Sequence, residues 1–543
     1  MAKFNLKICS AVVACSLAMS AALTGCNGIF SKTETSNSSD NTSSQTSTVN
    51  GEVTSKFGDN IAVKSENFAV SLAMVNRIFR STYNDFISYY ASYYGFDTSK
   101  SSKVQYYDED NGITWYDQFI DTAKSNVKQL LVLCEAAKKD GLSLDDNDKK
   151  NIETNIENMR AAADNAGLGF DDYISTTFGA GLTEKDVREN LEQTTLAQKY
   201  YQKVYNSFEY TDEEYEKSYE ENKESYQYVD FLTFTFGYGT VDSSDSSVTV
   251  DEQQKEVAKN AANELAKSKT EEEFTEYIRD YLNKNRDYVN LSSEESHTEE
   301  EYKTAIESQI ESAKVTKYAY EATTEAGKWL FDSGRNANDT YVFEGTSSYN
   351  VVMILKTPYR DESINKNVRH ILFTADTYGS DANAKKKADE VYEEWQKGEA
   401  DEESFGKLAT IYNADSDSGS AANGGLYKDV YQGQMVTELN DWVFAPERKE
   451  GDTGIVKTTY GYHIMYYVGD SMPAWKSSVD SVLRRTAYND AYSEVEKTVT
   501  IEFDDDYINT IPDPTEEVEE ASTVSQTDAQ PSEIESTVES SAE

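Results

Sequence analysis

Two of the three histidines in the chain stand in surroundings that suit chemistry. His370 lies in the run VRHILF and His463 in the run GYHIMYYV, and short apolar runs of this kind are typical of buried strands. A buried imidazole is either a hydrogen-bonded core residue or part of a site that uses both ring nitrogens. Neighbouring strands would bring the two side chains together, and such a pair must share its protons.

Other kinds of site find little support in the sequence. The four cysteines are Cys9, Cys15, Cys26 and Cys134, and the first three fall in or just after an N-terminal apolar segment. Cys134 then has no partner for an intramolecular disulfide. Three scattered histidines do not form a zinc motif. No HExxH or Ser/His/Asp arrangement of a protease appears. We therefore expect no metal and no cofactor.

The first residues carry an export signal. Lys3 and Lys7 precede an apolar stretch from Ile8 to Leu23 and then the sequence LTGC, which predicts a signal peptide over residues 1–25. The stretch has 16 residues, whereas a membrane-spanning helix needs roughly 20. The LTGC sequence resembles the lipobox of bacterial lipoproteins, which implies a diacylglycerol on Cys26. A plain secretory signal with a chance cysteine is the alternative.

Two polar segments flank the folded part. Residues 26–60 hold the lipidated cysteine and a Ser/Thr-rich stretch, and residues 511–543 are acidic and lack Lys and Arg. Neither segment has enough apolar surface to offset the entropy of ordering. We expect a flexible tether and a disordered acidic tail. The chain is then extracytoplasmic and anchored by lipid to the outer face of the cell membrane.

Charge excludes one class of partner. The chain has 543 residues and a formal net charge of −47, so the phosphates of nucleic acid would be repelled. An anionic membrane surface would be repelled as well, which leaves the lipid as the anchor. The hydrophobic content of 38% is sufficient for real cores between the tails.

Residues 61–225 are helical by pattern. Apolar residues recur at helical spacing over 65–95, 113–141 and 182–205, and Thr183 with Asp186 forms a loose capping box. Many of the 39 tyrosines fall in this region. They are either ordinary packing residues or a surface that binds unfolded chains, since tyrosine offers a large apolar area with a polar tip.

The second half of the chain repeats itself. Residues 328–355 align with 441–468 at a constant offset of 113 and without a gap. The matched pairs are Trp329 with Trp442, Phe331 with Phe444, Arg335 with Arg448, Asp339 with Asp452 and Thr340 with Thr453. Two copies of one domain are therefore expected, and we call them the first repeat (226–360) and the second repeat (364–472).

The first repeat lacks both histidines. Aligning 228–236 with 367–375 places Phe231 opposite His370, and the offset of 113 places Asn350 opposite His463. We therefore expect the first repeat to be a degenerate and inactive copy.

Each repeat is predicted to be a small α+β domain. In the second repeat we expect a strand, helices over 383–398 and 401–413, a short helix over 433–444, and two strands over 454–469 broken near Tyr460. A helix over 474–500 dominates the segment 473–510 that follows. The predicted fold class is multidomain α+β.

The second repeat resembles the parvulin family of peptidyl-prolyl isomerases. The motifs VRHILF, YNADSDSGS, NGGLY, GQM and TTYGYHI occur in the family's order and spacing over roughly 100 residues. The wider layout resembles PrsA-like extracytoplasmic foldase lipoproteins and their periplasmic SurA-type relatives. That resemblance implies an N-terminal helical chaperone region and a C-terminal helix that packs back onto it.

The resemblance implies a catalytic group. In the family the two histidines form a hydrogen-bonded pair flanked by an acid or a cysteine, which assigns His370 and His463 here. Asp415 is the best match for the third position, and Asp417 is the alternative because the loop length leaves the register open.

The resemblance also implies a prolyl pocket. Leu426, Met435 and Leu439 should line it, with Thr458 near its rim, and Tyr460 is a further substrate-binding residue. Many parvulins have Phe where Leu439 stands and a small polar residue where Tyr460 stands. No basic cluster follows the first strand, so the expected substrate is unphosphorylated.

These observations favour a membrane-anchored foldase that binds newly secreted, unfolded polypeptides and isomerises X-Pro bonds. The alternatives are a non-catalytic holdase of the same architecture and an unrelated binding lipoprotein such as a solute receptor. The client proteins remain unassigned, and the sequence leaves open a monomer or a homodimer.

Overall fold

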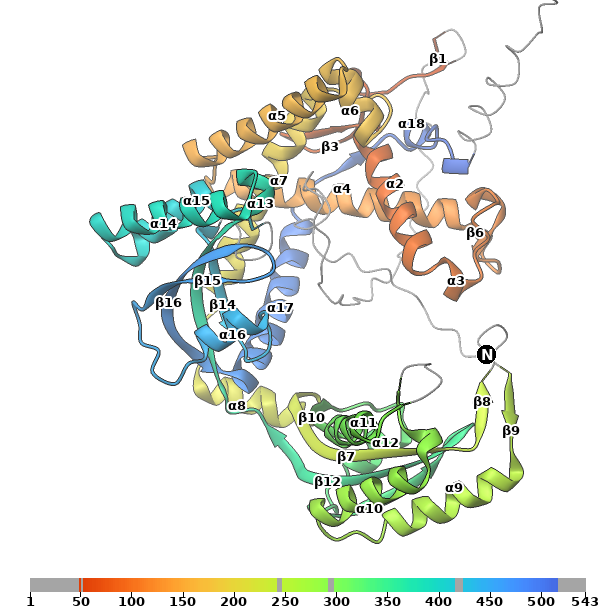
Figure 1. Cartoon of the computed structure of the whole chain (residues 1–543). Coiled ribbons are helices and arrows are strands. Elements are labelled where there is room, and N and C mark those ends of the chain that lie inside the picture. Colours follow the sequence, from red (N-terminus) through yellow and green to blue (C-terminus); the bar gives the residue numbers. More distant parts are fainter. Residues whose placement is uncertain (1–47, 50–51, 242–246, 292–296, 416–422, 516–543) are drawn as a thin grey trace, which may run out of the picture. The chain divides into compact units, whose positions relative to one another are not determined.

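A computed structural model describes residues 48–49, 52–241, 247–291, 297–415 and 423–515 (Figure 1). The predicted signal peptide, Cys26 and most of the tether and acidic tail lie outside these residues. The chain forms two compact units. One comprises residues up to 209 together with those from 485 onward, and the other comprises residues 210–484. Within the described residues, no helix is both long enough and apolar enough to cross a membrane.

The first unit is built from amphipathic helices around one apolar core. Phe79, Phe119, Leu130 and Leu131 are fully buried in it. The capping box of Thr183 and Asp186 is confirmed at the start of α7. The helices are α2 (Leu72–Tyr89), α3 (Ala91–Tyr94), α4 (Trp115–Lys139), α5 (Asp146–Ala166), α6 (Phe170–Phe178) and α7 (Glu184–Ser207).

The prediction of a purely helical region was wrong at its start. Residues 61–71 form strands β3 (Ile61–Lys64) and β4 (Ala69–Ser71), and β17 (Glu502–Phe503) joins them in the order β17-β3-β4. The helix expected from residue 65 begins only at Leu72, with Ser71 as its N-cap. A second short pair, β5 (Tyr106–Asp108) and β6 (Ile113–Thr114), precedes α4.

The C-terminal helix α17 (Ala474–Glu496) contributes to both units. In the second unit, Trp475 and Val479 are buried against Tyr215 and Tyr219 of α8 (Asp212–Glu221). In the first unit, Tyr488 is buried in the helical core, with its ring centroid 4.8 Å from that of Tyr201. The return of this helix to the N-terminal helices is therefore confirmed. After β17, α18 (Asp505–Ile508) also packs into this core.

The second unit contains two four-stranded antiparallel sheets of the same design. Their strand orders are β10-β7-β12-β11 and β14-β13-β16-β15, so each pair of equivalent strands takes the same place. In the first repeat the strands are β7 (Gln227–Gly237), β10 (Lys314–Ala319), β11 (Thr340–Glu344) and β12 (Ser348–Arg360). In the second they are β13 (Ile364–Phe373), β14 (Leu426–Val430), β15 (Thr453–Lys457) and β16 (Tyr462–Pro473).

The register of the last hairpin follows the offset of 113. Thr340 pairs with Met353, and Thr453 pairs with Tyr466 in the other sheet. The turns that lead into these hairpins also correspond. Asn338 N–H donates to Ile354 O at 2.7 Å, and Gly451 N–H donates to Tyr467 O at 2.9 Å. Both turn residues have positive φ, 68° and 86°.

The alignment of the other central strands was wrong by two residues. Asn350 pairs with Thr235, whereas its counterpart His463 pairs with Leu372. Thr233, rather than Phe231, therefore occupies the position of His370. A shift of two residues keeps every side chain on its face of the sheet, so the apolar pattern alone does not reveal the error.

The two faces of the second sheet are covered differently. Helices α14 (Asp381–Lys397) and α15 (Glu402–Tyr412) bury Ile371, Phe373 and Ile464 on one face. Helix α16 (Thr437–Val443) packs on the other face, where Val368 and Met465 are buried. The first repeat has α9 (Glu252–Leu265), α10 (Glu271–Lys284), α11 (Glu299–Ser312) and α12 (Glu325–Leu330), and a small strand pair β8 (Gly239–Val241) and β9 (Val248–Val250).

Candidate active site

The two histidines lie side by side on the face of the sheet that carries α16. His370 on β13 pairs with Met465, and His463 on β16 pairs with Leu372. Side chains alternate along each strand, so both imidazoles share a face with Val368 and Met465. Their exposed fractions are 4% and 3%. The sequence pattern therefore predicted a pair that the sheet register brings together.

The histidines are the centre of a short chain of hydrogen bonds. Nδ1 of His370 lies 3.2 Å from Nδ1 of His463, and Nε2 of His370 lies 2.7 Å from Oδ2 of Asp415. At the other end, Nε2 of His463 lies 2.9 Å from Oγ1 of Thr458. Asp415 thus takes the third position, while Asp417 lies outside the described residues.

One proton assignment satisfies every member of this chain. An ionised Asp415 accepts the Nε2–H of His370, which leaves Nδ1 of a neutral His370 as an acceptor. Nδ1 of His463 then donates to it, and Nε2 of His463 accepts the hydroxyl proton of Thr458. The Thr458 oxygen in turn accepts the backbone N–H of Tyr460 at 3.1 Å. With a neutral His370, donation in the opposite direction would require a protonated Asp415.

The electrostatics of His463 agree with this assignment. Burial, and secondly its neighbour His370, lower the pKa of His463 to about 3. The side chain is consequently neutral across the physiological range. A neutral imidazole can both donate and accept, which is what its place between Thr458 and His370 requires.

Two residues that the sequence interpretation missed hold Asp415 in place. The Tyr427 hydroxyl donates to Oδ2 of Asp415 at 2.7 Å, and its ring packs edge-on against His370 with centroids 5.1 Å apart. Asn413 Oδ1 accepts from the backbone N–H of Leu372 at 2.8 Å and from that of Asp415 at 3.2 Å. Both residues lie within the motifs YNADS and NGGLY, which was the available signal.

Gly425 allows the edge strand to approach the site. Its carbonyl accepts from the N–H of His370 at 2.9 Å, and its φ is +71°. A Cβ at this position would lie 2.1 Å from the carbonyl oxygen of His370. Only glycine fits this position, so the NGG sequence is required for the placement of Tyr427 beside the histidines.

The predicted pocket residues are only partly brought together. Leu439 is buried and Met435 is half-buried in the apolar cluster on the histidine face. Leu426 is half-buried, pairs with Arg369 across the sheet and does not join that cluster. Thr458 is 3% exposed and lies beneath His463 rather than at a rim, whereas Tyr460 is 65% exposed in the turn.

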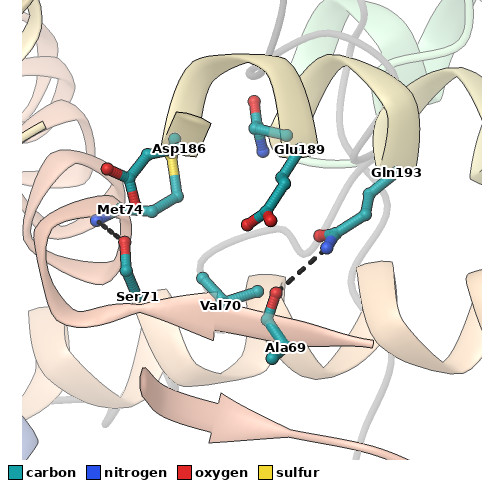
Figure 2. A pocket seen from close by; sticks show the side chains of 8 residues that line it. Ala69, Val70, Ser71, Met74, Asp186, Glu189 and Gln193 are labelled. Carbon is teal, nitrogen blue, oxygen red and sulfur yellow. Dashed lines mark hydrogen bonds between the residues drawn. The ribbon is translucent and has the colours of Figure 1, made fainter. Parts of the chain in front are cut away.

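Other candidate sites in the described part of the chain are weaker. No group of three or more His, Cys, Asp or Glu residues there is placed to hold a metal ion. A small recess lies between β4 and α7 (Figure 2). Its Ser71 side chain caps α2, and Gln193 Nε2 donates to the carbonyl oxygen of Ala69 at 3.0 Å. These groups hold the fold together, so the histidine centre is the candidate active site.

Comparison with known families agrees with the geometry. Residues 370–469 match the family described as "Rotamase: PPIC-type PPIASE domain". The second repeat is a parvulin-type rotamase domain. The match runs from His370 to residue 469 within β16, so the matched segment includes every residue of the hydrogen-bonded series.

Longer similarities extend beyond the rotamase domain. The chain is 30% identical over 222 residues to "Foldase protein PrsA 1" of Listeria monocytogenes serotype 4b, covering 41% of this chain and 65% of that protein. The protein of the same name from Listeria innocua is 29% identical over the same length. This chain thus spans less than two thirds of the length of these relatives, 65% in each case.

Two solved structures show only weak similarity to the chain. PrsA from Bacillus subtilis is 18% identical, with 58% of this chain and 88% of that chain covered and a TM-score of 0.18. PrsA from Bacillus anthracis is 14% identical, with 56% and 94% covered and a TM-score of 0.17. Scores this low carry no structural argument, so the assignment rests on the domain match and the site geometry.

Proposed function

We propose that the chain is a lipid-anchored extracytoplasmic foldase that binds newly secreted polypeptides and isomerises their X-Pro bonds in the second repeat. The main supporting observation is the buried series of hydrogen bonds that runs from Thr458 through the two histidines to Asp415 in a rotamase domain. The apolar side chains of Met435 and Leu439 lie on the same face of the sheet.

Isomerisation of an X-Pro bond requires a binding surface that favours the twisted amide, and it requires no catalytic acid, base or nucleophile. Rotation about the amide bond crosses a barrier of roughly 18–20 kcal/mol because resonance is lost in the twisted state. No bond is broken and no proton is transferred to the substrate. A site that holds the prolyl ring and excludes water from the twisting amide lowers the barrier, and about 4 kcal/mol corresponds to roughly a thousandfold.

The residues of the site divide this work. Met435 and Leu439 supply the apolar contact for the prolyl ring. His370 and His463, fixed by hydrogen bonds at both ends, form a rigid floor whose polar atoms already have partners. The floor therefore does not compete for the substrate carbonyl. Asp415 and Thr458 are positioning residues that select the tautomers.

The substrate class follows from the surroundings of the site. The motif after β13, FTADTYGSDANA, contains two aspartates and no basic residue. A phosphorylated Ser/Thr-Pro segment would find no cationic partner in this loop. The client is therefore an extended, unphosphorylated segment of a polypeptide that has just crossed the membrane.

Isomerisation by the full chain tests the proposal. A short unphosphorylated X-Pro peptide should isomerise faster with the wild type, and His370→Ala or His463→Ala should reduce kcat/KM by about tenfold or more. Thr233→Ala and Asn350→Ala, the matched changes in the first repeat, should leave kcat/KM unchanged. Circular dichroism checks that each variant is folded. No acceleration by the folded wild type would leave the non-catalytic holdase as the function.

Anchoring has its own test. Two acyl chains at Cys26 hold a protein on a membrane because each buried CH₂ contributes roughly 0.8 kcal/mol. Cys26→Ser should therefore move the exported chain from the membrane fraction to the soluble fraction. Retention of the variant in the membrane fraction would overturn the lipid anchor.

A further inference from the structure

Tyrosine side chains are exposed together where α2 passes into α3. Tyr89 is 69% exposed, Tyr90 53% and Tyr93 82%. Figure 1 shows α3 and the β5–β6 pair at the same end of the first unit. Scattered exposed aromatics are ordinary, but a contiguous exposed group of them marks an interaction surface.

These rings stand on a buried aromatic base. Phe86 and Trp115 are 3% and 5% exposed, and their ring centroids are 4.4 Å apart. We define the tyrosine platform as Tyr89, Tyr90, Tyr93, Tyr94 and Tyr107. Ring contacts link its members to the base: Tyr89–Tyr90 at 6.4 Å, Tyr90–Phe86 at 6.4 Å, Tyr94–Phe86 at 6.1 Å, Tyr93–Tyr94 at 4.9 Å, Tyr94–Trp115 at 5.7 Å and Tyr107–Trp115 at 5.1 Å.

This base makes the platform suitable for binding. Tyrosine presents a large amphipathic area with few rotatable bonds, so contact with it costs little conformational entropy. Packing against Phe86 and Trp115 restricts the rings further. A partner would therefore meet a surface that is already ordered.

The charge around the platform is negative. Residues 81–114 carry five carboxylates and two lysines. One of the lysines, Lys100, is paired with Asp97 at 2.8 Å. Strand β5 ends with Asp108, directly after Tyr107, and the turn to β6 begins with Glu109 and Asp110. Asp108 is close enough to add to the effect of burial in raising the pKa of Tyr107.

We propose that the tyrosine platform binds extended polypeptide segments that combine apolar with Lys or Arg side chains. The rings take apolar side chains on their faces and attract cations, and the adjacent carboxylates select positive over negative segments. A second copy of the chain is the wrong occupant, because its net charge of −47 opposes association. The proposal deepens the foldase function and rests on it for the source of the segments.

The test uses the full chain and a peptide without proline. A fluorescein-labelled 12-residue peptide of alternating Leu and Arg is titrated by anisotropy, next to a peptide with Glu in place of Arg. Tyr89→Ser/Tyr93→Ser should weaken binding of the Arg peptide at least tenfold. Glu109→Gln/Asp110→Asn should weaken it about threefold and reduce its salt dependence. Val257→Ser/Ile411→Ser, at exposed apolar residues of the second unit, is the matched control.

Each outcome has a definite meaning. Equal binding of the two peptides, or unchanged binding by the tyrosine variant, would overturn the proposal. Sedimentation of the wild type as a dimer that the tyrosine variant abolishes, without peptide binding, would assign the surface to a second copy instead. If the chain isomerises an X-Pro peptide but ignores the probe, the platform alone is wrong. If it binds the probe but does not isomerise, the enzyme function alone is wrong.

Discussion

The two repeats differ at the positions that form the hydrogen-bonded centre. Where the second repeat has His370 and His463, the first has Thr233 and Asn350 on strands of the same order. Val315, paired with Phe231, takes the position of Tyr427. The position of Asp415 does not exist in the first repeat, because Ala313 alone separates α11 from β10, whereas residues 413–425 separate α15 from β14.

What the repeats share is equally informative. Arg335 lies over the ring of Trp329 at 5.1 Å, and Arg448 lies over the ring of Trp442 at 3.8 Å. The hairpins and their entry turns agree residue by residue. The first repeat keeps the sheet and the arginine–tryptophan contact although it lacks the polar centre, which shows that the histidines are not needed to form this fold. Their presence in one copy is best explained by function.

The largest expected effect concerns the glycine that brings the edge strand to the histidines. Gly425→Ala should destabilise the second repeat by more than about 3 kcal/mol, because the new Cβ meets a backbone oxygen at positive φ. Gly379→Ala is the control, since its φ is +77° but nothing lies within 4 Å, and it should cost about 1 kcal/mol. Urea unfolding followed by tryptophan fluorescence measures both. Equal losses would contradict the close approach.

Low pH should destabilise the second repeat, which contains His463, and not the first. The pKa of His463 is about 3 in the folded state and 6.5 in the unfolded state. Between these pH values the unfolded chain therefore binds a proton at His463 that the folded chain does not bind. Stability is then unaffected above about pH 6.5 and falls as the pH drops toward 3. His463 should account for a loss of about 2 kcal/mol between pH 7 and pH 5.

His463→Asn, which introduces the residue of the first repeat, should remove this dependence. His297→Asn, outside both sheets, is the control. Unfolding free energies at pH 7 and pH 5 provide the measurement. The same loss in wild type and His463→Asn would show that the histidine is not held neutral.

Removing the charge of the third residue should have a smaller effect. Asp415→Asn keeps the shape but replaces charge-assisted hydrogen bonds from His370 and Tyr427 with neutral ones, a change of about 1 kcal/mol. We expect kcat/KM to fall up to about tenfold. Asp417→Asn should leave it unchanged. The opposite result would move the third position to Asp417.

The smallest expected difference concerns the arginine–tryptophan contact that both repeats have. Arg448 also donates from Nε to Trp442 O at 2.9 Å, while Nε of Arg335 has no hydrogen-bond partner in the described structure. Arg448→Ala should therefore cost about 1–1.5 kcal/mol and Arg335→Ala about 0.5–1 kcal/mol. Thermal unfolding compares them. A larger loss of unfolding free energy for Arg335→Ala than for Arg448→Ala would contradict the equivalence of the two arginine–tryptophan contacts.

Part of the fold could be predicted because the evidence for it is local. The offset of 113 located both hairpins, since a hairpin and its entry turn occupy one contiguous stretch of chain. The pairing of β7 with β12 is different. A shift of two residues preserves the apolar pattern, so Phe231 and Thr233 were indistinguishable until the hydrogen bonds of the sheet were known. Strands β3 and β4 were missed because one partner, β17, lies more than 400 residues away.

The site shows the same division. The motifs supplied His370, His463 and Asp415, but the role of Tyr427 depends on an edge strand that Gly425 brings close, and Leu426 pairs with Arg369 instead of joining the apolar cluster. The repeat, the helical region and the side chains capable of catalysis could be predicted from the amino-acid sequence, because residue types and spacing are local properties. The strand register, the tautomers and the neutral state of His463 became known only from the fold, because they depend on which groups burial brings within hydrogen-bonding distance.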